Sequence, residues 1–134
     1  MVLLFDLFHL PEDIYEVIFA TEQQKIVAKI LIKAMKENSG VMNKTEMSFF
    51  ATKLHDGELI AELDEGPYKG KKVKLSYNKR QFYDRILTPM RSMGMVDYDM
   101  YKKIYIVSDK FCKALTKISI MWQREVRGEP RLTE

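Results

Sequence analysis

Apolar residues recur at three- and four-residue steps in several stretches of the chain, which is the spacing that places side chains on one face of an α-helix. The clearest stretch is residues 79–92, where the recurring positions are Phe82, Tyr83, Ile86, Leu87 and Met90. Asn78 and Gln81 have the spacing of a capping box at its start, and Gly94 follows its end. The pattern predicts a helix at 79–92 whose first exposed turn is basic.

A β-hairpin is predicted after Gly94, because the period of the apolar residues changes there. Val96 and Tyr98 begin an extended run. A second extended run, 104–107 (Ile-Tyr-Ile-Val), follows after a turn near Asp99 and Met100. Two such runs joined by a short turn pair as antiparallel strands. We therefore expect a hairpin at 96–107.

Two further helices are predicted upstream. Thr21 with Gln24, and Asn43 with Glu46, have the capping-box spacing of a helix start. The first helix runs to about residue 37 and stops before Gly40; the second ends near residue 54. The expected inward residues are Ile26, Val27, Ile30, Leu31 and Ala34 in the first helix, and Met47, Phe49 or Phe50, and Leu54 in the second.

Residues 55–75 admit two interpretations. Leu59, Ala61 and Leu63 alternate with Ile60 and Glu62, and Val73 and Leu75 alternate with lysines. Glycines and a proline lie between these two runs. Two alternating runs joined by turn residues favour a hairpin. Leu59, Ile60 and Leu63 also satisfy helical spacing, so a short helix at 57–64 is the alternative.

Both ends of the chain are predicted to carry apolar helices. A short one spans Pro11 to Phe19, where Pro11 and the acids after it suit a helix start. A long one begins at Ser108 and runs to about Gly128. Its apolar stripe consists of Phe111, Leu115, Ile118, Trp122 and Val126.

The apolar face of the last helix is larger than the core of so small a domain is expected to cover. We expect it to pair with the same helix of a second copy, and packing on the first two helices is the alternative. Cys112, the only cysteine, excludes an internal disulfide and is predicted to be a buried thiol in this helix.

One run connects these elements: Ile86-Leu87-x-Pro89-Met90-x-x-x-Gly94-Met95-Val96, followed by an aromatic-rich hairpin and a Ser-Asp helix start. It resembles the recognition helix and wing of winged helix-turn-helix regulators, the MarR-like group among them. Upstream, Ile30-Leu31, Asn38-Ser39-Gly40 and Met42-Asn43-Lys44-Thr45-Glu46 resemble the opening of the same fold. The resemblance covers roughly residues 22–127.

This resemblance implies a mainly α fold with a small β-hairpin wing (α+β), in one domain. Its parts are an N-terminal apolar extension (1–20), a winged-helix core (21–107) and a C-terminal dimerisation helix (108–128). The stretch 55–75 departs from the family pattern, in which the second and third helices are joined by a few residues. With a helix at 57–64, the chain would instead resemble a PadR-like arrangement in which residues 45–54 form the first core helix.

The resemblance also implies that the chain binds double-stranded DNA, as a homodimeric transcriptional regulator. Helix 79–92 would read the major groove and the hairpin 96–107 would contact phosphates. The residues expected to contact DNA are Lys44, Thr45, Asn78, Lys79, Arg80, Gln81, Arg85, Lys102 and Lys103. Lys71, Lys72 and Lys74 either extend the phosphate contacts or form the charged edge of a strand. Pro89 is expected to bend the helix near its end.

Charge is unevenly distributed along the chain, although the net charge is only +3. Residues 70–91 hold seven Lys or Arg against Asp84 alone, whereas residues 1–20 hold four acids and no Lys or Arg. Asp84 either accepts from a cytosine or pairs with Arg80 or Arg85. Positive charge is thus concentrated where the resemblance places DNA.

Catalytic chemistry is not indicated. His9 and His55 are far apart, and the chain has no phosphate-binding glycine loop, no zinc-type cysteine set and no nucleophile beside an evident base. We expect no enzyme activity, no cofactor and no metal. The opening MVLLFDLFHL is interrupted by Asp6 and is too short to span a membrane, so we expect a cytoplasmic protein with no membrane partner.

Two other functions remain open. A winged helix that binds protein instead of DNA would use an aromatic surface made of Tyr77, Phe82, Tyr98, Tyr101 and Tyr105. A repressor that responds to a small-molecule effector would add a pocket between the N-terminal helices and the dimer helix, and no residue pattern identifies the ligand.

Overall fold

The fold is mainly helical with a small antiparallel sheet, an α+β architecture. The computed structural model describes residues 5–62 and 72–128. The helices are α1 (Ile14–Ile18), α2 (Glu22–Glu37), α3 (Lys44–His55), α4 (Lys79–Phe82), α5 (Thr88–Met93) and α6 (Lys110–Arg127). The strands are β1 (Val41–Asn43), β2 (Leu59–Glu62), β3 (Lys72–Leu75), β4 (Val96–Asp99) and β5 (Ile104–Val107).

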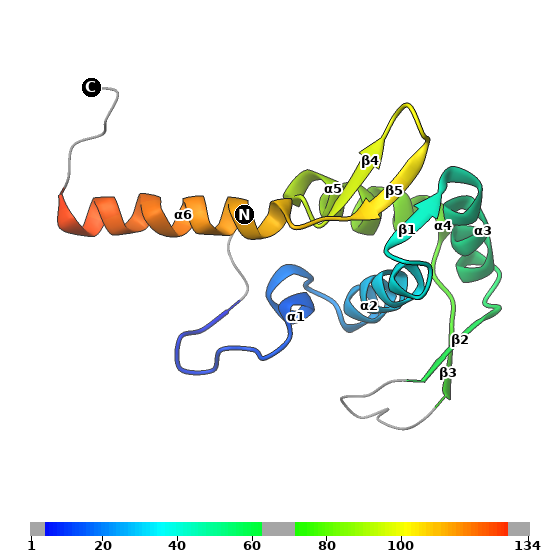
Figure 1. Ribbon diagram of the computed structural model, residues 1–134. Helices are drawn as coiled ribbons and strands as arrows, with labels where there is room; N and C mark the ends of the chain where they lie inside the picture. Colours follow the sequence, from blue (N-terminus) through cyan, green and yellow to red (C-terminus); the bar gives the residue numbers. More distant parts are fainter. Residues whose placement is uncertain (1–4, 63–71, 129–134) are drawn as a thin grey trace.

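The predicted hairpin at 96–107 is confirmed, and it belongs to a larger sheet. Strands β4 and β5 pair in antiparallel register with Tyr98 opposite Tyr105. β1, which the sequence pattern did not predict, pairs with the other edge of β5 and gives the order β1-β5-β4 (Figure 1). Because β1 lies between α2 and α3, it fixes both helices to the hairpin.

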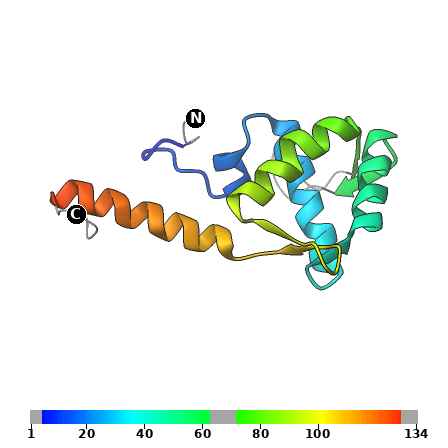
Figure 2. The same cartoon turned by 90° about the horizontal axis from the view of Figure 1, so that it is seen from above.

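The core lies between α2, α3 and the α4–α5 stretch, which Figure 2 shows as neighbouring helices. The inward residues predicted for α2 and α3 are buried or half-buried, and the choice left open in α3 is decided: Phe50 is buried and Phe49 is 62% exposed. The largest fully buried side chains are Phe82, Leu31, Met35, Met47, Leu54, Ile86, Leu87, Met90, Val27 and Val96.

Capping side chains set the helix starts. At α3 the predicted capping box is formed in both directions, with Glu46 N–H donating to Asn43 Oδ1 at 2.7 Å and Asn43 N–H donating to Glu46 Oε1 at 3.1 Å. At α2 the side chain of Thr21 accepts from the N–H of Gln24 at 3.2 Å. These local patterns are the ones that sequence identifies best.

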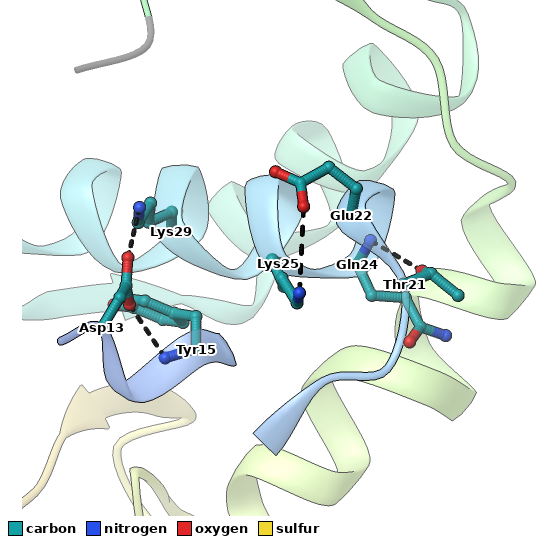
Figure 3. A network of polar contacts seen from close by, with 7 residues as sticks. All are labelled: Asp13, Tyr15, Thr21, Glu22, Gln24, Lys25 and Lys29. Carbon is teal, nitrogen blue, oxygen red and sulfur yellow. Dashed lines mark hydrogen bonds and ion pairs between the residues drawn. The ribbon is translucent and has the colours of Figure 1, made fainter. Parts of the chain in front are cut away.

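The N-terminal helix is shorter than predicted, because Asp13 is its cap and not a residue within it. Asp13 accepts from the N–H of Tyr15 at 2.9 Å, and its second oxygen pairs with the ammonium of Lys29 on α2 (Figure 3). Burial raises the pKa of the Tyr15 phenol, with the Asp13 carboxylate adding to the effect and Lys29 opposing it. This network fixes α1 to the side of α2.

The two ends of the insertion pair as the predicted hairpin requires, and its expected turn, within 63–71, lies outside the described residues. Strand β2 pairs with β3 in antiparallel register, from Leu59 opposite Leu75 to Glu62 opposite Lys72. The alternative helix at 57–64, on which the PadR-like arrangement depended, is therefore wrong. Tyr77 N–H donates to Leu54 O at 3.0 Å, so the ends of the insertion are held together.

Helix α6 leaves the body of the domain and extends alone (Figures 1 and 2). It starts at Lys110, two residues later than predicted, and ends at Arg127 with Gly128 as its cap, close to the predicted end. None of its residues, all of which the structure describes, is buried. Packing on the first two core helices, α2 and α3, is therefore wrong, and so is the buried thiol, because Cys112 is exposed. The amphipathic pattern indicated a covered face, but beyond Phe111 at its base no segment within residues 5–62 and 72–128 covers it.

Candidate nucleic-acid interface

The predicted helix at 79–92 consists of α4, a π-helical turn at Tyr83–Leu87, and α5. Asn78 caps it by accepting from the N–H of Gln81 at 3.1 Å. Pro89 has no N–H to donate to the preceding turn, and its ring crowds that turn. Within the wider turn, the N–H of Thr88 donates to Tyr83 O, five residues back. The hydrogen bond before Pro89 therefore spans one residue more than in an α-helix.

The two faces of this stretch differ as predicted. The apolar residues Phe82, Ile86, Leu87 and Met90 are buried, and Tyr83 is half-buried. The outward residues are exposed and polar: Asn78, Arg80, Gln81, Asp84, Arg85 and Thr88. The core therefore holds the helix while its whole outer face is available to a partner.

Arg80 and Asp84 form an ion pair one turn apart on that face. Arg80 Nε lies 3.8 Å from Asp84 Oδ2, and the two side chains are 92% and 66% exposed. Such an exposed pair contributes little stability, about 0.3–0.5 kcal/mol, so a phosphate or base could displace Asp84 at small cost. Arg85 is exposed and makes no ion pair with any residue that the structure describes.

Lys79 has a different place from the one predicted. Its backbone N–H donates to His55 Nδ1 at 3.1 Å, and its ammonium donates to Thr52 Oγ1 at 3.0 Å and to Ser48 Oγ at 3.4 Å. Lys79 therefore connects α4 to α3 and is not free for a base edge. His55 was missed because it lies 24 residues away in sequence, across the insertion.

The start of α3 also differs from the expectation. Lys44 and Thr45 were expected to contact DNA, and at a helix start such contact could come from backbone N–H groups. The N–H of Lys44 instead donates to Lys103 O at 3.1 Å, and the Glu46 carboxylate occupies the helix start as part of the capping box. The side chains of Lys44 and Thr45 are exposed, so contact with a phosphate would come from these side chains.

The turn of the β4–β5 hairpin presents Lys102 and Lys103, both exposed. Asp99 shapes the turn, because its Oδ1 accepts from the N–H groups of Tyr101 at 2.9 Å and Lys102 at 3.1 Å. Asp97 pairs with Lys110 of α6, Nζ to Oδ2 at 2.6 Å. Both acids of the hairpin therefore have internal partners.

Aromatic rings fix α5 to the sheet. Tyr98 and Tyr105 lie 4.6 Å apart between ring centroids, and the Arg91 guanidinium stands 5.2 Å and 5.9 Å from them. Burial raises the pKa of Tyr105, and Arg91 opposes this. Tyr77, Phe82 and Tyr105 belong to the core, so of the aromatic surface considered for protein binding only Tyr101 is fully exposed.

The residues expected at a dimer interface lie along α6, in the open. Phe111 is half-buried at the base of the helix, and the residues farther along it are more exposed: Leu115 40%, Ile118 51%, Trp122 68% and Val126 66%. Phe5, Leu7, Phe8 and Leu10 are exposed in the N-terminal segment. This segment and α6 project from the same side of the body in both views (Figures 1 and 2).

A cleft of about 660 Å³ lies between α2, α3 and Leu59 at the start of β2. Its apolar lining consists of Ile30, Ala34, Met42, Phe49, Phe50 and Leu59. The charged residues Lys33, Lys53, Glu37, Glu46 and Glu58 also line it. The effector pocket was expected elsewhere, between the N-terminal helices and the dimer helix.

The remaining predicted site residues are the lysines of the insertion. Lys71 lies outside the described residues, and for Lys72 and Lys74 the structure gives the backbone position in β3. Across residues 5–62 and 72–128, no three His, Cys, Asp or Glu side chains gather to hold a metal ion. In the same ranges no helix is long and apolar enough to cross a lipid bilayer.

Comparisons with protein-family models, with curated proteins and with solved structures find no match to this chain.

Proposed function

We propose that this chain is a winged-helix protein that binds double-stranded DNA as a homodimer and regulates transcription in the cytoplasm. The order of its elements supports the fold: α2, β1, α3, the α4–α5 helix, then the β4–β5 hairpin, with sheet order β1-β5-β4. In this fold α4–α5 is the recognition helix and the hairpin is the wing.

The outer face of the recognition helix carries this proposal. The exposed side chains Arg80, Gln81 and Arg85 occupy its N-terminal half, on a helix whose opposite face is buried. The major groove of B-DNA admits a helix of this kind, and arginine can donate to O6 and N7 of guanine together. We assign direct readout to Arg80 and Arg85, with Asp84 displaced from Arg80 on binding.

Phosphate contacts would surround this helix. Lys102 and Lys103 at the wing turn and the side chains of Lys44 and Thr45 belong to one corner, because the N–H of Lys44 donates to Lys103 O. Such contacts orient a protein on the duplex without reading its sequence. Lys79 takes a positioning role here, since it ties the recognition helix to α3.

The exposed stripe of α6 supports the dimer. An 18-residue helix that exposes Leu115, Ile118, Trp122 and Val126 along one face, without cover from the described parts of its chain, is unfavourable in water. Pairing with the same stripe of a second copy about a two-fold axis would cover it. The N-terminal apolar segment would add to the buried area.

The proposal is tested by fluorescence anisotropy with a duplex selected from a random pool. Arg80→Ala and Arg85→Ala should each weaken binding roughly 10- to 100-fold, since a bidentate base contact provides about 1–3 kcal/mol. Lys36→Ala, which removes an exposed charge from α2, is the matched control and should bind like the unmodified chain. Circular dichroism establishes that all three variants are folded. Equal affinity for all of them would contradict the assignment of α4–α5 as the recognition helix.

One observation favours a second function, a protein-interaction module. Phe49 is 62% exposed beside the 660 Å³ cleft, with the Lys53 ammonium 4.9 Å from its ring centroid. This second function predicts little salt-dependent affinity for DNA and loss of partner capture in Phe49→Ser.

A further inference from the structure

Helix α6 has a second face, opposite in character to its apolar stripe. Lys110, Lys113, Lys117 and Arg124 recur at steps of three, four and seven residues, so they share one side of the helix. The only acid within α6, Glu125, falls instead between Ile118 and Met121 on the apolar side. We call Lys113, Lys117 and Arg124 the basic face.

The stability of the helix does not account for this arrangement. Like charges three and four residues apart, such as those of Lys113 with Lys110 and Lys117, destabilise a helix. After the N-cap Asp109, the first turn of α6 contains no further acid and begins with a lysine, although the positive end of a helix favours acids. A surface helix that only needed solubility would mix both signs.

The orientation of α6 brings the basic face to the same side as the wing. The ammonium of Lys110 reaches Asp97 of β4 at 2.6 Å, which fixes the rotation of the first turn. The hydrogen bond from Phe111 N–H to Gly94 O, 3.1 Å long, holds the base of α6 at the end of α5. In Figure 1 the β4–β5 hairpin stands on one side of α6 and the N-terminal segment on the other.

The basic face is also accessible. Lys113 and Lys117 are exposed and Arg124 is partly exposed. None of the three makes an ion pair with another residue in the described parts of the chain. At about 1.5 Å per residue, α6 is roughly 27 Å long, comparable with about eight base pairs of duplex.

We propose that the basic face of α6 contacts the phosphate backbone of the duplex beyond the segment held by the recognition helix and the wing. Charge complementarity and continuity with the wing through the Lys110–Asp97 pair identify the partner as DNA. The inference rests on the proposed DNA binding. It leaves the apolar stripe for the second copy, so both faces of α6 are used.

The test is the salt dependence of DNA affinity for Lys113→Gln/Lys117→Gln. Glutamine preserves helix propensity, and Lys33→Gln/Lys36→Gln removes the same charge from exposed positions of α2. On a duplex of about 40 base pairs, the slope of log affinity against log salt should fall by roughly two per protomer in the α6 variant and remain unchanged in the control. On a duplex trimmed to the selected site, the slopes of the α6 variant and the unmodified chain should converge.

The outcomes separate this inference from the proposed function. If the unmodified chain binds DNA and the α6 variant has the same slope on the long duplex, the basic face does not contact DNA and only this inference fails. If the unmodified chain shows no salt-dependent binding, the proposed function fails as well. Sedimentation of both variants establishes that the oligomeric state is unchanged, so a reduced slope cannot come from a lost dimer.

Discussion

The imidazole Nδ1 of His55 accepts a hydrogen bond from the backbone N–H of Lys79 at 3.1 Å. The last residue of α3 therefore caps the first residue of α4, although 24 residues separate them in sequence. Together with the bond from Tyr77 N–H to Leu54 O, this contact holds the insertion closed at its base. The inserted hairpin thus leaves the arrangement of the two helices fixed.

His55→Ala should destabilise the fold by about 1 kcal/mol, because the N–H of Lys79 loses its acceptor. His55→Asn should recover most of this loss, since the amide oxygen can stand near the position of Nδ1 and accept from the same N–H. Urea denaturation measures both. His9→Ala, in an exposed turn, should have no effect, and an equally small effect of His55→Ala would show that the cap is not needed.

Gly94→Ala should cost about 2 kcal/mol or more, while Gly128→Ala should cost about 1 kcal/mol. Both glycines have left-handed backbone, with φ of 87° and 68°. A Cβ at Gly94 would lie 2.9 Å from Phe111 N, whereas a Cβ at Gly128 would meet nothing within 4 Å. Thermal unfolding compares the two variants. Equal costs would mean that α6 shifts readily at its base.

The local elements could be predicted because their signals lie within a few residues. The Asn43–Glu46 box, the stop at Gly94 and the hairpin at 96–107 each depend on neighbouring side chains or on a short period. The π-helical turn at Tyr83–Leu87 could not be located, because many helices accommodate a proline by bending instead.

The errors concern contacts between distant segments. Lys79 has the sequence context of an exposed first-turn residue, yet its partners Thr52 and His55 lie on another helix. Cys112 has the context of a core position, because periodicity records that a face is apolar and not what covers it. Strand β1 is only three residues long, too short for alternation to be visible.

Ile118→Ser/Leu115→Ser should convert the protein from dimer to monomer without lowering the stability of the domain core, because neither side chain is buried in the chain itself. Sedimentation measures the first effect and urea denaturation the second. Met100→Ser, at the exposed wing turn, is the control.

Trp122, the only tryptophan, reports on the same interface. On dilution of the unmodified chain its emission should shift to the red as the dimer dissociates. Emission that is independent of concentration, together with a monomer at every concentration tested, would contradict the dimer.

Asp97→Asn should lower the melting temperature slightly at pH 7 and by less at pH 3. The hydrogen bond with Lys110 lowers the pKa of Asp97 in the folded chain. A carboxyl whose pKa is lower when folded stabilises the fold above its unfolded pKa of about 4, and this contribution is lost as the pH falls through the folded value. A difference in melting temperature that is the same at both pH values would contradict this role of the pair.

Selection from a random duplex library by gel shift at two salt concentrations, followed by sequencing of the retained DNA, tests the central claim most directly. A homodimeric winged-helix regulator predicts weaker retention at the higher salt and enrichment of a palindrome with half-sites about one helical turn apart. No retention at the lower salt concentration would contradict DNA binding, and retention without an enriched sequence would contradict base readout by Arg80 and Arg85.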